Sequence, residues 1–293
     1  MYTAEKPLWK NRLRASGKRA RMPRRSLRCS TAITGFWRAN MKLHDLHSAL
    51  ETRIPRAYAC EWDNDGLMCT PDPDAEVRRV LCTLDVTDDA LRYAAANGFD
   101  VVLSHHPLIF HKLGALTPDD HIAKKVLFAV QNGISVLSYH TRFDAMPGGM
   151  NDLLAGALCL MQTEPFGDGE SDMGRIGLLP AEIDIYDFCA QIKRVLHADA
   201  LLLAKAHDTA HRVAVLGGDG KDFIRGAIAA GADTYVSGRL SYNTMAEAAE
   251  MGITLVEAGH FYTENIICAY YLRLLAALGI PGACYDSNRI EIV

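Results

Sequence analysis

The chain has 293 residues, of which 49% are hydrophobic, which is enough for a large core and for two domains. No apolar run approaches the roughly 20 residues that a transmembrane helix needs, so a membrane-spanning protein is not expected. The net charge of −4 is unevenly distributed: residues 1–40 hold eleven Lys or Arg and one acid, and the other 253 residues hold 20 basic and 34 acidic side chains. An acidic body argues against a nucleic-acid surface over most of the protein.

The basic segment 1–40 has three interpretations. Its Arg-rich, acid-poor composition is typical of a targeting peptide or of a disordered arm that binds polyanions. The third interpretation is a start codon assigned too early, and we favour it because a helical apolar spacing (Leu43, Leu46, Leu50) begins directly after Met41. The segment lacks the apolar stretch of a secretory signal, and the eight cysteines include no C-x-x-C pair. We therefore expect reduced thiols in a cytoplasmic protein.

Strand-like and helix-like segments alternate through the first half of the chain. Thr87 is suited to cap a helix, and Gly98 is suited to end it. In chain order, we expect a helix over 41–53, a strand over 80–86, a helix over 88–97, a strand over 99–104, a helix over 119–132, a strand over 134–138 and a helix over 150–159.

The alternation resumes after residues 161–174, a segment rich in Gly, Asp and Glu that we interpret as a linker. The expected elements are strands over 175–179, 213–216, 234–237 and 253–257, and helices over 183–196, 221–230, 241–251 and 261–278. This pattern predicts an α/β fold with two units, 41–160 and 175–293, whose sheets are parallel or mixed and flanked by helices.

Five residues that can bind metal follow predicted strands. His105 and His106 end one strand, and Asp144 lies six residues beyond the end of the next. His260 and Glu264 are four residues apart on a helix, so both project from one face. Adjacent histidines alone are common in loops, but ligands gather at the carboxyl ends of strands in such sheets. Two metal ions about 3.5–4 Å apart would use all three imidazoles and both carboxylates, whereas one ion would not. This donor set suits zinc, iron or manganese.

Two further features leave alternatives open. His140 either hydrogen-bonds to a metal ligand and orients it, or is a turn histidine bonded to backbone. The run Gly217-Gly218-Asp219-Gly220 lies between a strand and a helix, where backbone N–H groups can bind phosphate. It lacks the P-loop pattern, and we favour the alternative that the glycines only allow a tight turn. The sequence has no G-x-S-x-G nucleophile motif, so the catalytic group remains unknown apart from a water activated by metal.

Several motifs in this order resemble the type 2 GTP cyclohydrolase I family, also called the NGG-interacting-factor-3-like family. They are Trp62-Asp63-Asn64-Asp65-Gly66-Leu67, Leu84-Asp85-Val86-Thr87, Ser104-His105-His106-Pro107, Pro147-Gly148-Gly149-Met150-Asn151-Asp152 and Gly259-His260-Phe261-Tyr262-Thr263-Glu264. The resemblance extends from Met41 to the end and matches the short bacterial form. It implies two related α/β domains, a toroidal homohexamer, and a dinuclear metal site between the domains, closed by the C-terminal part. His105, His106, Asp144, His260 and Glu264 fall on its metal ligands.

The sequence departs from the family where an acid and a histidine are usual: this chain has Arg239, Tyr242 and Asn243. We expect a hydrolase that acts on a small molecule, either GTP, another nucleotide or a cyclic amide, with Arg142 or Arg239 pairing with phosphate oxygens. The alternative is a non-catalytic metal-binding protein with a regulatory or scaffold role.

Overall fold

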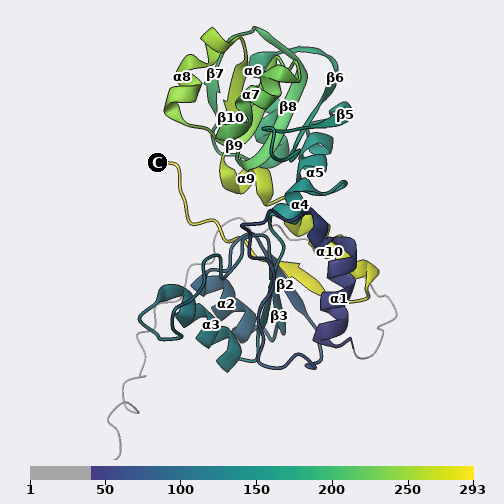
Figure 1. The fold of residues 1–293 in the computed structure, drawn as a ribbon, viewed down its shortest axis with the longest axis vertical. Helices are drawn as coiled ribbons and strands as arrows, with labels where there is room; N and C mark the ends of the chain where they lie inside the picture. Colours follow the sequence, from purple (N-terminus) through teal and green to yellow (C-terminus); the bar gives the residue numbers. More distant parts are fainter. Residues whose placement is uncertain (1–40) are drawn as a thin grey trace, which may run out of the picture. The chain divides into compact units, whose positions relative to one another are not determined.

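The computed structural model describes residues 41–293, and the three interpretations of residues 1–40 lie outside this range. The protein has an α/β fold with two mixed sheets, each flanked by helices (Figure 1). The predicted fold class is therefore confirmed. Within residues 41–293 no helix is long and apolar enough to cross a lipid bilayer.

The first sheet has the strand order β1-β4-β3-β2-β11. Four strands are parallel, and β1 is an antiparallel edge. Because side chains alternate along a strand, Cys82 and Leu103 face one side of this sheet, while Leu81 and Val102 face the other. The strand bounds are β1 Gly66–Cys69, β2 Val80–Thr83, β3 Val101–Ser104, β4 Ser135–Ser138 and β11 Gly282–Cys284.

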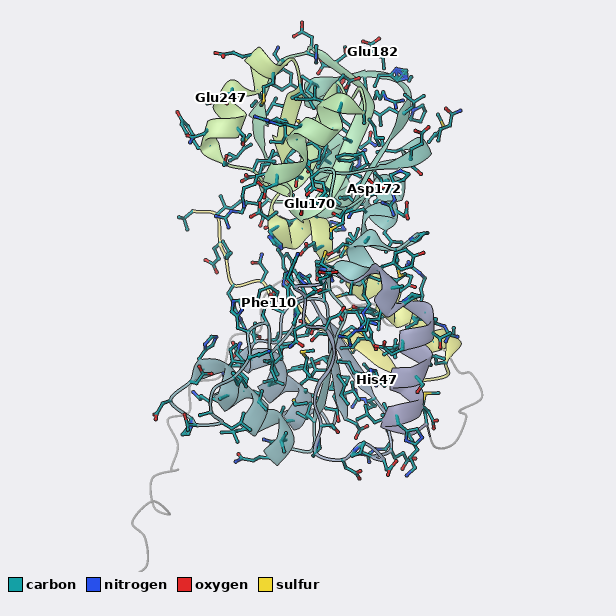
Figure 2. All side chains as sticks on the ribbon, viewed as in Figure 1. His47, Phe110, Glu170, Asp172, Glu182 and Glu247 are labelled. Atoms are coloured by element: carbon teal, nitrogen blue, oxygen red, sulfur yellow. The ribbon has the colours of Figure 1, made fainter. Side chains whose placement is uncertain are left out.

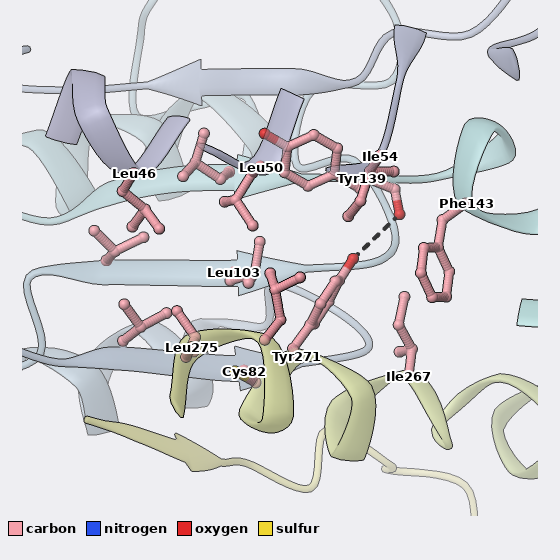
Figure 3. Close-up of a cluster of buried hydrophobic side chains, with 14 of the residues drawn as sticks. Leu46, Leu50, Ile54, Cys82, Leu103, Tyr139, Phe143, Ile267, Tyr271 and Leu275 are labelled. Carbon is pink, nitrogen blue, oxygen red and sulfur yellow. Dashed lines mark hydrogen bonds between the residues drawn. The ribbon is translucent and has the colours of Figure 1, made fainter. Parts of the chain in front are cut away.

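Helices from both ends of the described chain cover one face of the first sheet. Leu46 and Leu50 from α1 (Leu43–Arg53) pack in one cluster with Tyr271 and Leu275 from α10 (Ile267–Ala277), as Figure 3 shows. The hydroxyl of Tyr271 donates to the carbonyl of Tyr139 (3.4 Å), so this buried polar group is satisfied. Helices α2 (Asp88–Ala96) and α3 (His121–Gln131) cover the opposite face.

The second sheet has the order β5-β6-β8-β9-β10-β7. Its central strands β8, β9 and β10 are parallel, and the other three are antiparallel to their neighbours. Helices α5 and α6 pack on one face, and α7 and α8 on the other. The bounds are β5 Met161–Phe166, β6 Gly174–Asp184, β7 Leu202–Ala204, β8 Thr209–Asp219, β9 Thr234–Arg239, β10 Thr254–Glu257, α5 Met150–Ala157, α6 Ile185–Leu196, α7 Ile224–Ala229 and α8 Tyr242–Met251.

Strands β7 and β11 were not expected from the sequence, and two predicted segments differ in the structure. Residues 161–166, within the predicted linker, form strand β5. The helix expected over 261–278 is two helices, because residues 265–266 form a turn between α9 (His260–Glu264) and α10. Helix α9 lies against β8 and β9 of the second sheet, and α10 lies against β2 and β11 of the first. The remaining short helices are η2 Arg56–Tyr58, α4 Thr141–Ala145 and η3 Lys221–Phe223.

Candidate metal site

The five predicted donor residues come together, each from the carboxyl end of a parallel strand or the helix that follows it. His105 and His106 directly follow β3, and Asp144 lies on α4 after β4. His260 and Glu264 lie on α9 after β10. The five donor residues thus lie together at the carboxyl ends of the strands, as expected from the sequence.

The carboxylate of Glu264 lies among three imidazoles. Its Oε2 is 3.0 Å from His106 Nε2 and 2.8 Å from His260 Nε2, and its Oε1 is 3.8 Å from His105 Nε2. The two Nε2 atoms of His106 and His260 are 3.4 Å apart. Asp144 completes the group, with Oδ1 3.4 Å from His105 Nε2.

Two atoms of this cluster have no hydrogen-bond partner among the described residues: His105 Nε2 and Asp144 Oδ1. Both are buried, and each unsatisfied buried polar group costs about 1–3 kcal/mol. A divalent ion would satisfy both, because it accepts an imidazole lone pair and a carboxylate oxygen together. Three nitrogen and two carboxylate donors also form a set that zinc, iron and manganese accept. The residues present therefore fit a metal.

Hydrogen bonds at the Nδ1 atoms orient both histidines of the pair. His105 Nδ1 donates to the carbonyl of Tyr139 (2.9 Å), and His106 Nδ1 donates to Asp85 Oδ1 (2.7 Å). Each Nε2 is thereby directed toward the cluster. Such partners fix the ring position and the tautomer of a ligating histidine.

The charged groups of the cluster influence one another strongly. Burial disfavours the charged form of His106, but hydrogen bonds with Asp85 and Glu264 raise the pKa of its imidazole to about 10. Burial by itself would raise the pKa of Glu264, but the three imidazoles hold it well below its ordinary value. Burial raises the pKa of Asp144. A metal ion that binds here must displace any proton from the ligating nitrogens.

His140 lies beside this cluster and is held by a carboxylate. One of its ring nitrogens lies within 4.8 Å of donor nitrogens of His105 and His106. Its Nδ1 is 3.0 Å from Asp63 Oδ1, which leaves Nε2 for the site. The partner of the His140 ring is thus a carboxylate and not a backbone group, as the alternative of a turn histidine had required. Trp62 and Phe110 contact the ring edge-on, with centroids 6.4 and 6.1 Å away (Phe110 is labelled in Figure 2).

The glycine run after Leu216 lets the backbone of β8 pack closely against Glu264. The N–H of Gly217 donates to Asn151 Oδ1, and that of Gly218 donates to Thr263 Oγ1, so neither is free for phosphate. Gly218 has φ +70°, and a Cβ there would lie 2.2 Å from Glu264 Oε1. Only glycine lets β8 approach the Glu264 carboxylate this closely.

Of the two arginines expected to contact phosphate, Arg142 is unavailable. Its side chain is fully buried, and its guanidinium bonds to both oxygens of Asp65 at 2.7 Å and to Glu51 at 2.9 Å. That expectation was wrong for Arg142, because its donors already bond to Asp65 and Glu51. Arg239 is exposed at the end of β9 and lines a cavity beside the cluster.

This cavity has a volume of about 740 Å³ and includes His106 and His260 in its wall. The side chains of Arg239 and Lys125 also line it, and neither makes an ion pair with any residue in 41–293. Ser287, Asn288, Arg289 and Ile290, near the end of the chain, form another part of the wall. A second cavity, of about 400 Å³ between α2 and α3, contains none of the five donor residues.

Sequence reasoning assigned no role to three residues that contact this site. Asp85 follows β2 as the two histidines follow β3, so the strand-end argument could have found it. Asp63 lies in the Trp62-Asp63-Asn64 motif, which supported the family resemblance but suggested no function for this carboxylate. For Ser287 the sequence offers no signal, because it lies outside every motif.

Comparison with known proteins places the chain in a family. The sequence profile of Duf34/NIF3 (NGG1p interacting factor 3) matches residues 41–281. The chain belongs to this family. A NIF3-family relative from Clostridium perfringens, named GTP cyclohydrolase 1 type 2 homolog, is 31% identical over 230 residues, covering 76% of this chain and 87% of the relative. A relative of the same name from Lactococcus lactis is 30% identical over 253 residues, covering 85% and 96%.

Solved structures of NIF3-related proteins have the same fold. The Bacillus cereus protein related to NIF3 superposes with a TM-score of 0.77 at 23% identity, covering 87% of this chain and 99% of that one. Reduced HcgD from Methanocaldococcus jannaschii superposes with a TM-score of 0.74 at 28% identity, covering 84% and 98%. The predicted family and fold are thus confirmed.

Proposed function

We propose that this protein is a dinuclear metal-dependent hydrolase, with His105, His106, Asp144, His260 and Glu264 as the ligands of two divalent ions. One observation carries the proposal: five donors converge at strand ends, and two buried donor atoms, His105 Nε2 and Asp144 Oδ1, lie 3.4 Å apart without a hydrogen-bond partner among the described residues. When bound, the ions would supply an activated water and polarise the bond to be cleaved. The relatives named GTP cyclohydrolase 1 type 2 homolog support this class of reaction.

The surrounding residues have defined tasks in this proposal. Tyr139 and Asp85 hold the two adjacent imidazoles in place through their Nδ1 atoms. His140, held by Asp63, stands where its Nε2 can accept or return a proton beside the cluster.

The cavity beside the cluster favours the proposal that the substrate is an anionic small molecule, such as a nucleotide. Arg239 and Lys125 line it and have no carboxylate partner in the described chain, so they can pair with phosphate or carboxylate oxygens. Arg239 replaces the acid usual in the family, so GTP and cyclic amides should be tested against other phosphorylated compounds. Arg239→Glu should raise the KM for an anionic substrate.

The test uses protein loaded separately with zinc, iron and manganese. Turnover of nucleotides, small phosphate esters and cyclic amides is measured together with the metal content per chain. His105→Ala and Glu264→Ala should abolish turnover and lower the metal content, while His47→Ala on α1, outside the cluster, should change neither. Two ions retained in both ligand variants would refute the ligand assignment. If the metals bind and every substrate fails, the non-catalytic metal-binding function is supported instead.

Two further properties belong to the proposal. Family resemblance favours a homohexamer, which light scattering of the purified chain would test by its mass. The cysteines of residues 41–293 are free thiols, which supports a reducing compartment such as the cytoplasm.

A further inference from the structure

The last residues of the chain run along the carboxyl end of the first sheet. Strand β11 pairs in parallel with β2, with Cys284 opposite Cys82. The N–H of Tyr285 then donates to the carbonyl of Cys82 (2.8 Å), which continues the pairing beyond the strand. This pairing directs residues 287–290 to the cavity beside the donor cluster.

Ser287 makes two hydrogen bonds to one residue, Asp85. Its Oγ accepts from the Asp85 N–H (3.2 Å) and donates to Asp85 Oδ2 (3.1 Å). Ser287 is only 3% exposed, although it lies six residues before Val293. A buried hydroxyl with both bonds made to one partner fixes that partner's position closely.

Asp85 passes this constraint to the donor cluster. With Oδ2 held by Ser287, its Oδ1 accepts from His106 Nδ1 at 2.7 Å. His106 Nε2 in turn lies 3.0 Å from Glu264 Oε2. A carboxylate held at one oxygen can rotate about its side-chain bonds, whereas one held at both oxygens keeps its hydrogen-bond direction.

The segment that carries Ser287 is itself anchored. The guanidinium of Arg289 pairs with Asp89 on α2 and also donates to the hydroxyl of Tyr285 (3.1 Å). The ring of Tyr285 packs against Tyr93, with centroids 5.2 Å apart. These contacts lie on both sides of Ser287, so its position depends on packing and not on its two bonds alone.

We propose that Ser287 is a positioning residue of the metal site, which fixes the direction of His106 through Asp85. The C-terminal segment is then part of the functional site and not only the end of the fold. This inference rests on the proposed metal site, since His106 matters only as a ligand, but its test does not require turnover.

The experiment compares Ser287→Ala with Ser287→Thr, which keeps the hydroxyl. Ser135→Ala is the matched control: Ser135 is also buried and makes one side-chain hydrogen bond, at the opposite end of the same sheet. Zinc affinity is measured by competition with a chromophoric chelator. Loss of a partner that orients a metal ligand lowers affinity 10–100-fold, and we expect a loss of about tenfold for Ser287→Ala. Ser287→Thr should restore most of it, and Ser135→Ala should leave it unchanged.

A second measurement needs no metal. Solvent exchange of the His106 Nδ1 proton, observed by NMR in the ion-free protein, should be faster in Ser287→Ala than in the wild type and near normal in Ser287→Thr. Wild-type zinc affinity and wild-type exchange in Ser287→Ala would overturn the inference. Lowered affinity and faster exchange in a protein that hydrolyses nothing would support the positioning role and count against the hydrolase proposal alone.

Discussion

Replacing Arg142 by methionine should destabilise the protein strongly. The guanidinium is fully buried and makes two 2.7 Å bonds to Asp65, one to Glu51 and one to the carbonyl of Ile54 (3.0 Å). Burial disfavours its charge, but the two carboxylates more than offset this, so the pKa of Arg142 is raised. In Arg142→Met the aliphatic side chain leaves Asp65, itself 8% exposed, as a buried charge without its partner.

Breaking a buried ion pair in this way costs about 3–5 kcal/mol of unfolding free energy. That is a large part of the roughly 5–15 kcal/mol typical of a folded protein. Urea unfolding followed by circular dichroism would measure it, with Arg92→Met as control. Arg92 pairs with Asp88 and Asp89 on the surface, and its loss should not measurably change stability.

The same reasoning predicts that Arg142→Met combined with Asp65→Asn recovers part of the loss, because the buried Asp65 carboxylate is then replaced by a neutral amide. If the unfolding free energy of Arg142→Met lies within about 1 kcal/mol of that of the wild type, the ion pair of Arg142 and Asp65 does not stabilise the fold.

Two further predictions concern the surroundings of the donor cluster. Gly218→Ala should displace Glu264 and lower the metal content, since the new Cβ would meet Oε1 at 2.2 Å, while Gly98→Ala, with similar φ of +67° but nothing within 4 Å, should keep the ions. Unchanged metal content in Gly218→Ala would contradict the close approach. Hydrogen bonds from His140 and Thr141 outweigh burial and lower the pKa of Asp63 to about 2. The ionised Asp63 carboxylate therefore contributes to stability above its unfolded pKa near 4, and this contribution is lost between pH 4 and 2. In Asp63→Asn the free energy of unfolding should fall less steeply over that pH range.

The donor cluster could be predicted from the sequence because a simple geometric rule locates it. His105, His106 and Asp144 follow neighbouring parallel strands, whose carboxyl ends meet at one edge. His260 and Glu264 were recognisable as a pair because a spacing of four residues places them on one helix face, and the 2.8 Å contact between them reflects this.

Other features could not be predicted because they depend on contacts between distant segments. Ser287 and Asp85 are 202 residues apart, and no local pattern relates them. The prediction of one continuous helix over 261–278 was wrong, because apolar spacing does not reveal that the two parts of this segment pack on different sheets. Arg142 could not be excluded as a phosphate contact from the sequence, since its burial depends on Asp65 and Glu51, which lie far from it in the chain.

The pairing of β11 with β2 has a consequence for how the protein is made. During synthesis β2 is complete about 200 residues before β11, a delay of roughly 10–40 s at ordinary translation rates. Throughout that time β2, and not β11, is the edge of the nascent first sheet, and an unpaired edge strand invites pairing with other chains. Closing so long a loop is also slow. His260 and Glu264 are also made long after His105 and His106, so the complete donor set is expected to form only after strand β10 has been synthesised.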